Sequence, residues 1–192
     1  MNKRLVVIIT TTVALTVFAV GAYRYSQMKD AAPPVEAAVE VDRLVRDYSP
    51  VLGAREAPVT IVEFFDPACE TCRAFHPLVK QFLQKYPNEV RVVVRYAAFH
   101  QGSDVAVRIL EAARLQGKYE VVLEALLAAQ PRWAAHHNPN LDQAWDAAAS
   151  AGLNIARARN DILMPGITAT LNQDMADIQA IDVKKTPIAS DH

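Results

Sequence analysis

The sequence contains very little cysteine: Cys69 and Cys72 are the only two in 192 residues. This count excludes a four-cysteine zinc site. The two cysteines lie three positions apart, and a disulfide across so short a loop removes little entropy from the unfolded chain, so a stabilising staple is a poor interpretation. We therefore expect the pair to carry chemistry.

An excess of either charge is also missing. The chain has 20 basic and 21 acidic side chains and a net charge of −1, whereas proteins that bind nucleic acids usually present a basic surface. The sequence also lacks internal repeats and long low-complexity segments. We therefore expect an ordinary domain with no nucleic-acid partner.

The N-terminal segment is uncharged over a long stretch. Lys3 and Arg4 precede residues 5–22, which form an uncharged run of 18 residues. That length is close to what a helix needs to cross a bilayer and exceeds the usual apolar region of a signal peptide. We expect a signal anchor in the inner membrane, and a signal peptide cleaved after Gly21 is the alternative. Either way, the remainder is exported to the periplasmic face, where disulfides persist.

The middle of the chain alternates between strand and helix patterns. Residues 59–65 are a nearly continuous run of β-favouring side chains, as in a strand buried on both faces. From Cys69 to Tyr86, apolar residues recur every three or four positions, which predicts an amphipathic helix that Pro77 kinks. A second strand follows at residues 90–96. Strand, helix and strand in this order predict a parallel unit.

A long helical insertion follows, with Ser103 as the expected N-cap of its first helix. Trp133 and Trp145 are expected to pack inside it, and His136 and His137 to lie on its surface. We expect helices over residues 103–114, 118–129, 141–151, 154–163 and 168–181. The chain is therefore predicted to have five parts: a leader (1–22), a juxtamembrane linker (23–46), the first part of an α/β domain (47–101), the helical insertion (102–181) and a short end (182–192). Residues 35–46 of the linker are predicted to form a weak helix.

The spacing of Cys69 and Cys72 fits redox chemistry at the start of a helix. Cysteines at positions i and i+3 join across the first helical turn, and the sulfur nearer the N-terminus faces unpaired N–H groups that favour the thiolate. We expect Cys69 to be the more exposed, attacking cysteine and Cys72 the shielded, resolving one. A lone Cys-x-x-Cys is a weak signal, but here it directly follows a buried strand and opens an amphipathic helix.

Two other functions stay open on these residues. His76 follows Cys72 by four positions, so Cys69, Cys72 and His76 form an alternative site for a soft metal such as copper. The simpler interpretation of His76 is a helix residue that binds nothing, and we expect no metal. The remaining alternative is a non-catalytic binding factor that keeps the fold of a redox protein in a truncated form and has lost its activity through that truncation.

The pattern around the cysteines extends well beyond them. It comprises residues 49–53, residues 57–66, Arg73 after the second cysteine and a late Thr186-Pro187. Together these residues resemble the DsbA-type thiol–disulfide oxidoreductases of the thioredoxin superfamily, over roughly residues 47–187. The resemblance implies an α/β thioredoxin-like fold with an inserted helical domain. It also implies a dithiol oxidase that acts on exported protein thiols and disulfides, is recycled by a membrane redox partner and needs no cofactor.

The resemblance assigns roles to three residues outside the cysteine pair. Glu63 matches the acidic residue that lies beneath the cysteines in this family and assists proton transfer during exchange. Thr186 and Pro187 match the cis-proline loop, which lies against the cysteines and offers backbone groups to substrate. We therefore expect Glu63 to be catalytic, and Thr186 and Pro187 to bind substrate.

The sequence departs from the family pattern in two places. Glu70 and Thr71 stand between the cysteines, where strongly oxidising members carry a histidine, and a carboxylate there disfavours a nearby thiolate. We therefore expect weaker oxidising power. Only residues 188–192 follow Pro187, so we expect a fold that lacks its C-terminal strands and helix. Such an incomplete sheet predicts an exported portion that is marginally stable or prone to aggregate.

Overall fold

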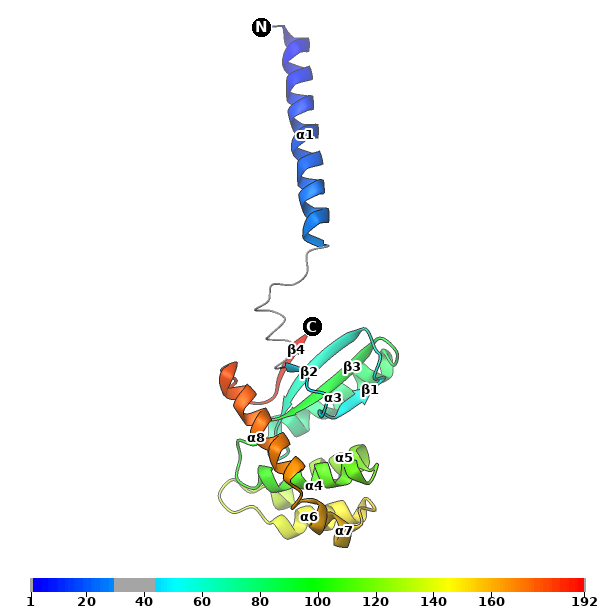
Figure 1. Ribbon diagram of the computed structural model, residues 1–192, viewed down its shortest axis with the longest axis vertical. Coiled ribbons are helices and arrows are strands. Elements are labelled where there is room, and N and C mark those ends of the chain that lie inside the picture. Colours follow the sequence, from blue (N-terminus) through cyan, green and yellow to red (C-terminus); the bar gives the residue numbers. More distant parts are fainter. Residues whose placement is uncertain (1, 30–43, 192) are drawn as a thin grey trace. The chain divides into compact units, whose positions relative to one another are not determined.

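The computed structural model describes residues 2–29 and 44–191 (Figure 1) and divides by contact into two units, Met1–Glu40 and Val41–His192. The described part of the first unit is a single helix, α1 (Lys3–Lys29). Among the described residues, no helix combines the length and apolar character that crossing a bilayer requires. The weak helix predicted over residues 35–46 lies mostly outside the described residues.

A four-stranded sheet forms the centre of the second unit (Figure 1). Its strands are β1 (Val51–Gly53), β2 (Val59–Phe65), β3 (Val90–Tyr96) and β4 (Ile188–Asp191), in the order β1-β3-β2-β4. The two central strands, β2 and β3, pair in parallel, and the outer two pair antiparallel to them. Both central strands are rich in Val, Ile and Phe, as expected for strands that are covered on both faces.

Helix α3 (Glu70–Lys85) connects β2 to β3 and includes Pro77. The observed strand, helix and strand confirm the parallel unit predicted from the sequence, with strand bounds that are the same as those expected. Because α3 starts directly after the end of β2, the cysteine pair lies at the carboxyl end of the central parallel strands.

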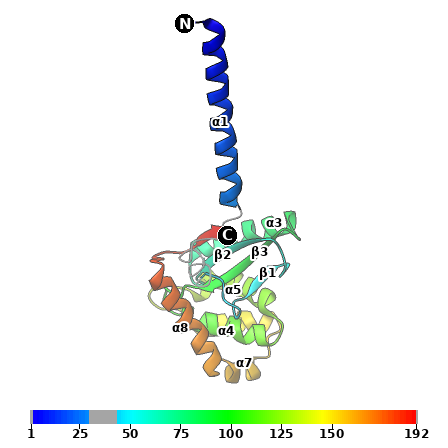
Figure 2. The same cartoon turned by 45° about the horizontal axis from the view of Figure 1, so that its top comes forward.

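The chain between β3 and β4 is helical, as predicted. Its helices are α4 (Ser103–Leu115), α5 (Tyr119–Trp133), α6 (Leu141–Ser150), α7 (Ile155–Asp161) and α8 (Pro165–Ala180). In Figures 1 and 2, α4 to α7 lie together on one side of the sheet and α8 runs beside them towards the sheet. The helical insertion is therefore a layer that packs against the strands and not a separate domain on a linker.

Several helix boundaries differ from the prediction, most clearly at α5 and α8. Helix α8 begins at Pro165 and not at residue 168, because proline is well suited to the first turn of a helix. Helix α5 was expected to end at Ala129 but continues through Pro131 to Trp133, whose buried indole nitrogen donates a 2.8 Å hydrogen bond to the Leu126 carbonyl. This bond stabilises the last turn, where proline supplies no backbone donor. Ser103 was expected to be an N-cap but is the first residue of α4, and its hydroxyl bonds to the Asp66 side chain instead.

The sheet gains a strand that the sequence interpretation did not expect. Residues 188–191 follow the cis peptide bond between Thr186 and Pro187 and pair with β2 as β4. The expectation that the C-terminal strands are lacking therefore needs correction for this one strand. The physical reason is that the outer edge of β2 offers unpaired backbone groups with which an extended segment readily pairs.

Two apolar clusters fill the interior on the two faces of the sheet. The larger joins one face to helices α4–α8 and includes Trp133 and Trp145, which pack within the helical layer as predicted. The smaller lies on the other face, where Val62, Phe64 and Val93 pack against Ile178 of α8. Helix α8 therefore contributes to both clusters.

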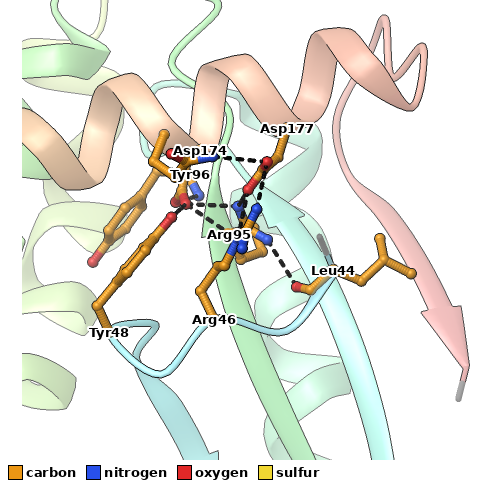
Figure 3. Close-up of polar contacts among 8 residues, drawn as sticks. Leu44, Arg46, Tyr48, Arg95, Tyr96, Asp174 and Asp177 are labelled. Carbon is orange, nitrogen blue, oxygen red and sulfur yellow. Dashed lines mark hydrogen bonds and ion pairs between the residues drawn. The ribbon is translucent and has the colours of Figure 1, made fainter. Parts of the chain in front are cut away.

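A buried ionic network fixes α8 to the sheet (Figure 3). Arg95 of β3 is fully buried and donates hydrogen bonds to Asp174 (2.9 Å), to Asp177 (2.7 Å) and to the Leu44 carbonyl (2.9 Å). Arg46 approaches Asp177 from the other side, at 2.8 and 2.9 Å. The network therefore joins the start of the domain, its central strand and the last helix of the insertion.

Candidate active site

Asp66, the first residue after β2, organises the loop that leads to the cysteines. Its buried carboxylate accepts hydrogen bonds from the backbone nitrogens of Ala68 and Phe99, both at 2.9 Å, and from the Ser103 hydroxyl. The Nδ1 atom of His100 lies 2.7 Å from the same carboxylate. One side chain thus fixes the loop after β2 against the loop after β3.

The two cysteines occupy the start of α3, as the sequence predicted. Cys69 is the N-cap residue and Cys72 lies in the first turn, with 6% and 0% of their surfaces exposed. Both thiols are free. Burial raises the pKa of Cys72, and the neighbouring Cys69 raises it further. Cys69 is therefore the more exposed of the two residues, although it is less exposed than we expected, and Cys72 is fully shielded.

The cis-proline segment lies against the first cysteine. The Cys69 Sγ atom donates a 3.5 Å hydrogen bond to the carbonyl oxygen of Thr186, and the peptide bond between Thr186 and Pro187 is cis. The structure thus brings Cys69 together with the Thr186-Pro187 segment, more than one hundred positions later in the sequence.

Glu63 lies inside the fold, on the face of β2 that α3 covers. Only 4% of its surface is exposed, and its Oε1 atom has no hydrogen-bond partner among the described residues. Burial raises the pKa of this carboxyl group to about 7. Glu63 lines a cavity of about 300 Å³ that is otherwise apolar and reaches Pro187. Glu63 is therefore a buried residue of β2 and does not face solvent.

The residues between the cysteines face outward. Glu70 and Thr71 are exposed, and the Glu70 carboxylate lies 3.3 Å from the Nε2 atom of His136. His136 belongs to the loop after α5, and its ring centre is 6.0 Å from that of His100. His136 is exposed as predicted, but it also contacts the redox loop. Sequence reasoning missed this contact because nothing local links residue 136 to residue 70.

The alternative metal site is not assembled. The Nε2 atom of His76 lies 3.8 Å from a carboxylate oxygen of Glu124 on α5, and burial lowers the pKa of His76. In the part of the chain that the structure describes, no three His, Cys, Asp or Glu side chains are placed to hold a metal ion.

Gln130 is a site residue that the sequence interpretation missed. Its buried side chain reaches from α5 to the redox loop and donates 2.9 Å hydrogen bonds to the carbonyl oxygens of Pro67 and Cys69. A glutamine in an amphipathic helix carries no sequence signal for such a contact.

The fold and the site together define a class of protein. A parallel strand–helix–strand unit opens its helix with Cys-x-x-Cys, faces a cis-proline and carries a helical insertion, which is the DsbA-type arrangement of a thioredoxin-like fold. A family model described as Thioredoxin matches residues 46–189, and the chain belongs to this family.

Known proteins show the same likeness. A solved thioredoxin-like oxidoreductase from Silicibacter pomeroyi is 35% identical, with a TM-score of 0.69 over 79% of this chain and 84% of that one. The solved alpha-DsbA1 of Wolbachia pipientis shares the fold at 18% identity, with a TM-score of 0.70 over 79% of this chain and 78% of that one. A Na(+)/H(+) antiporter NhaA of Herminiimonas arsenicoxydans is 25% identical over 94% of this chain, which spans only 27% of the antiporter's length.

Proposed function

We propose that this protein is a thiol–disulfide oxidoreductase that exchanges disulfides with exported proteins, in the manner of a DsbA-like dithiol oxidase. The observation that carries the proposal is the placement of Cys69, which caps the start of α3 and contacts the carbonyl of Thr186 before the cis-proline. Membership of the thioredoxin family and the 35% identical oxidoreductase support the same chemistry.

The exchange proceeds in two steps on an oxidised Cys69–Cys72 pair. A substrate thiolate attacks the Cys69 sulfur, the bond to Cys72 breaks, and Cys72 leaves as a thiolate that takes up a proton. A second substrate thiolate then attacks the substrate sulfur of the mixed disulfide and releases Cys69. The substrate loses two protons and two electrons, and the enzyme ends as a dithiol.

The buried groups suit these roles. Burial raises the pKa of Cys72, and a leaving thiol of high pKa departs slowly unless a proton reaches it, so the step that opens the pair needs a proton donor nearby. We assign the associated proton transfer to Glu63, because a carboxyl group with a pKa of about 7 both gives and accepts a proton at neutral pH.

The proposed location is the extracytoplasmic side of the inner membrane. Lys3 and Arg4 followed by the uncharged residues 5–22 support export, either as an anchor or as a cleaved signal. The reduced enzyme must pass two electrons to an acceptor before the next cycle, and we propose a membrane redox partner for this step. A fusion to a reporter enzyme that folds only outside the cytoplasm tests the location.

The proposed exchange is tested by trapping its covalent intermediate. Replacing Cys72 with serine leaves Cys69 without a resolving partner, so Cys72→Ser should accumulate a mixed disulfide with a thiol-containing substrate. Cys69→Ser is the matched control and should form none. Gel mobility with and without reductant measures both. Equal trapping by the two variants would contradict the assigned roles.

The direction of exchange is tested by equilibrium with glutathione. An oxidase or isomerase should show a two-electron transition at about −120 to −180 mV. A reductase should show its transition at about −270 mV. A pair that behaves like two independent, unstructured thiols would remove the proposal altogether.

A further inference from the structure

The loop that carries Cys69 is held in part by a residue from another element of the fold. Within the loop, the backbone nitrogens of Ala68 and Cys69 bond to the side chain and the carbonyl of Asp66. The carbonyls of Pro67 and Cys69 also have a distant partner: both accept hydrogen bonds from the single Nε2 atom of Gln130 on α5, 63 and 61 positions away respectively. The irregular segment before α3 therefore depends on a side chain of the helical insertion.

The side-chain amide of Gln130 has the two hydrogen-bond donors that are needed to bond both carbonyls. A primary amide nitrogen carries two hydrogens, which point in fixed, divergent directions, and here each bonds to one carbonyl at 2.9 Å. Both carbonyls are consequently fixed relative to each other and to α5. Because only 1% of the Gln130 surface is exposed, solvent does not compete for these bonds.

The carbonyl of Cys69 is also where α3 begins. It accepts the first hydrogen bond of the helix, from the backbone nitrogen of Arg73 at 3.1 Å, while Cys69 itself has φ −74° and ψ 120° and no side-chain cap. A bond from Gln130 to this same oxygen therefore fixes the Cys69 backbone at the point where it enters the helix. The position of the Cys69 sulfur at the helix N-terminus follows from that backbone.

The end of α5 that carries Gln130 is itself held by a hydrogen bond across its last turn. The next residue is Pro131, and the fully buried Trp133 bonds to the Leu126 carbonyl across it. The Oε1 atom of Gln130 is buried and has no hydrogen-bond partner among the described residues. An apolar side chain would fill the same space without burying an unpaired oxygen, so packing alone does not account for an amide at this position.

We propose that Gln130 is a positioning residue of the redox site, which holds the Cys69 backbone so that its sulfur is correctly placed for exchange. This inference rests on the proposed thiol–disulfide exchange and deepens it. Small displacements of reacting atoms slow reactions strongly, so the helical insertion controls the reactivity of Cys69 through this one side chain. Gln130 does not touch the substrate in this role.

The test compares two glutamine-to-methionine variants of the full chain. Gln130→Met keeps the length of the side chain and removes both donors. Gln116→Met is the matched control, because Gln116 also bonds a distant backbone, at Asn154, but lies away from the cysteines. The readouts are the rate at which the reduced protein reacts with a small aromatic disulfide, the pH dependence of Cys69 thiolate absorbance, and the melting temperature.

The expected result for Gln130→Met is an exchange rate at least about tenfold lower and an altered thiolate titration, in a protein that still melts cooperatively. Gln116→Met should match the unmodified protein in rate and titration. A Gln130→Met variant that is less stable but reacts and titrates like the unmodified protein would show a merely structural residue and overturn the proposal.

If Gln130→Met does not fold, a measurement on the unmodified chain tests the proposal instead. The side-chain amide resonances of Gln130 should differ between the oxidised and reduced forms of the pair, while those of Gln116 should not. Identical Gln130 resonances in the two forms overturn the proposal. An unmodified protein that does not react with disulfides refutes the proposed function instead, and the two failures are thus distinguishable.

Discussion

At the scale of single residues, Glu63 is a buried carboxyl group that lowers stability when it is ionised and to which we assign proton transfer. Its carboxyl group is buried in an otherwise apolar cavity, and burial raises its pKa from an ordinary 4.5 to about 7. The folded protein therefore binds this proton more tightly than the unfolded chain does. Below pH 4.5 both states carry the proton, and above pH 7 neither does.

This difference predicts a pH-dependent stability. Between pH 4.5 and 7 the unfolded state loses the proton while the folded state keeps it, so the free energy of unfolding falls as the pH rises. The pKa difference corresponds to a loss of about 3 kcal/mol, complete above pH 7. Glu63→Gln should remove this loss and be more stable than the unmodified protein at pH 8, but not at pH 4. Denaturant unfolding at the two pH values measures it.

The control for this prediction is Glu56→Gln, which changes an exposed carboxylate. It should leave the pH dependence as it is, whereas Glu63→Gln should also slow thiol–disulfide exchange. If Glu63→Gln has the same stability difference from the unmodified protein at both pH values, the carboxyl group is not the cause.

At the scale of secondary-structure elements, α8 is attached to the sheet by charge as well as by apolar contact (Figure 3). Burial raises the pKa of Asp174, while at Asp177 burial is outweighed by hydrogen bonds from Arg46 and Arg95, which lower the pKa. The two carboxylates thus share a fully buried cation on β3. A buried pair of this kind is destabilised strongly when one partner is removed.

Replacing Arg95 should therefore destabilise the protein far more than replacing Arg46. Arg95→Met removes the cation that Asp174 pairs with and leaves Asp177 paired with Arg46, so it should cost about 3–5 kcal/mol of unfolding free energy. Arg46→Met removes a partly exposed partner of Asp177 and should cost about 1 kcal/mol or less. Denaturant melts of both variants give these values. Similar losses in the two variants would mean that burial does not govern the strength of the network.

At the scale of the whole molecule, α3 presents an apolar stripe to solvent beside the Glu63 cavity. Phe75, Leu78 and Phe82 are 41%, 53% and 42% exposed and all line this cavity. Contiguous exposed apolar surface promotes association between molecules. The sequence-based expectation that the protein is prone to aggregate therefore has a specific surface to which it can be assigned, and it stays a prediction.

Leu78→Gln should reduce self-association with little effect on stability. The side chain is half exposed, so the unfolding free energy should change by no more than about 0.5 kcal/mol. Leu163→Gln is the control, because Leu163 is 76% exposed but lies away from the stripe, in the helical insertion. The light scattered at increasing protein concentration, which measures self-association, should fall for Leu78→Gln and not for Leu163→Gln. An equal decrease in both variants would mean that overall surface hydrophobicity, and not the stripe on α3, causes the self-association.

Much of the fold could be predicted from local patterns. The run of β-favouring residues in β2, the three- and four-residue spacing in α3 and the cysteines at their junction are properties of contiguous sequence, since side-chain period reports directly on burial. The positions of Cys69 and Cys72 at the start of a helix follow from the same patterns. Glu63 and Pro187 entered through resemblance to a family, because nothing in their neighbours assigns them a role.

What only the tertiary structure decided is how distant segments meet. Local periodicity does not indicate that Gln130 bonds the Cys69 carbonyl, that Arg95 shares two acids of α8, or that residues 188–191 pair with β2. Each of these contacts satisfies a buried polar group left open by an element far along the chain. The sequence thus determined where the cysteine pair lies, at the start of a helix after a buried strand, and the packing of the helical layer against the sheet determined what holds the pair in place.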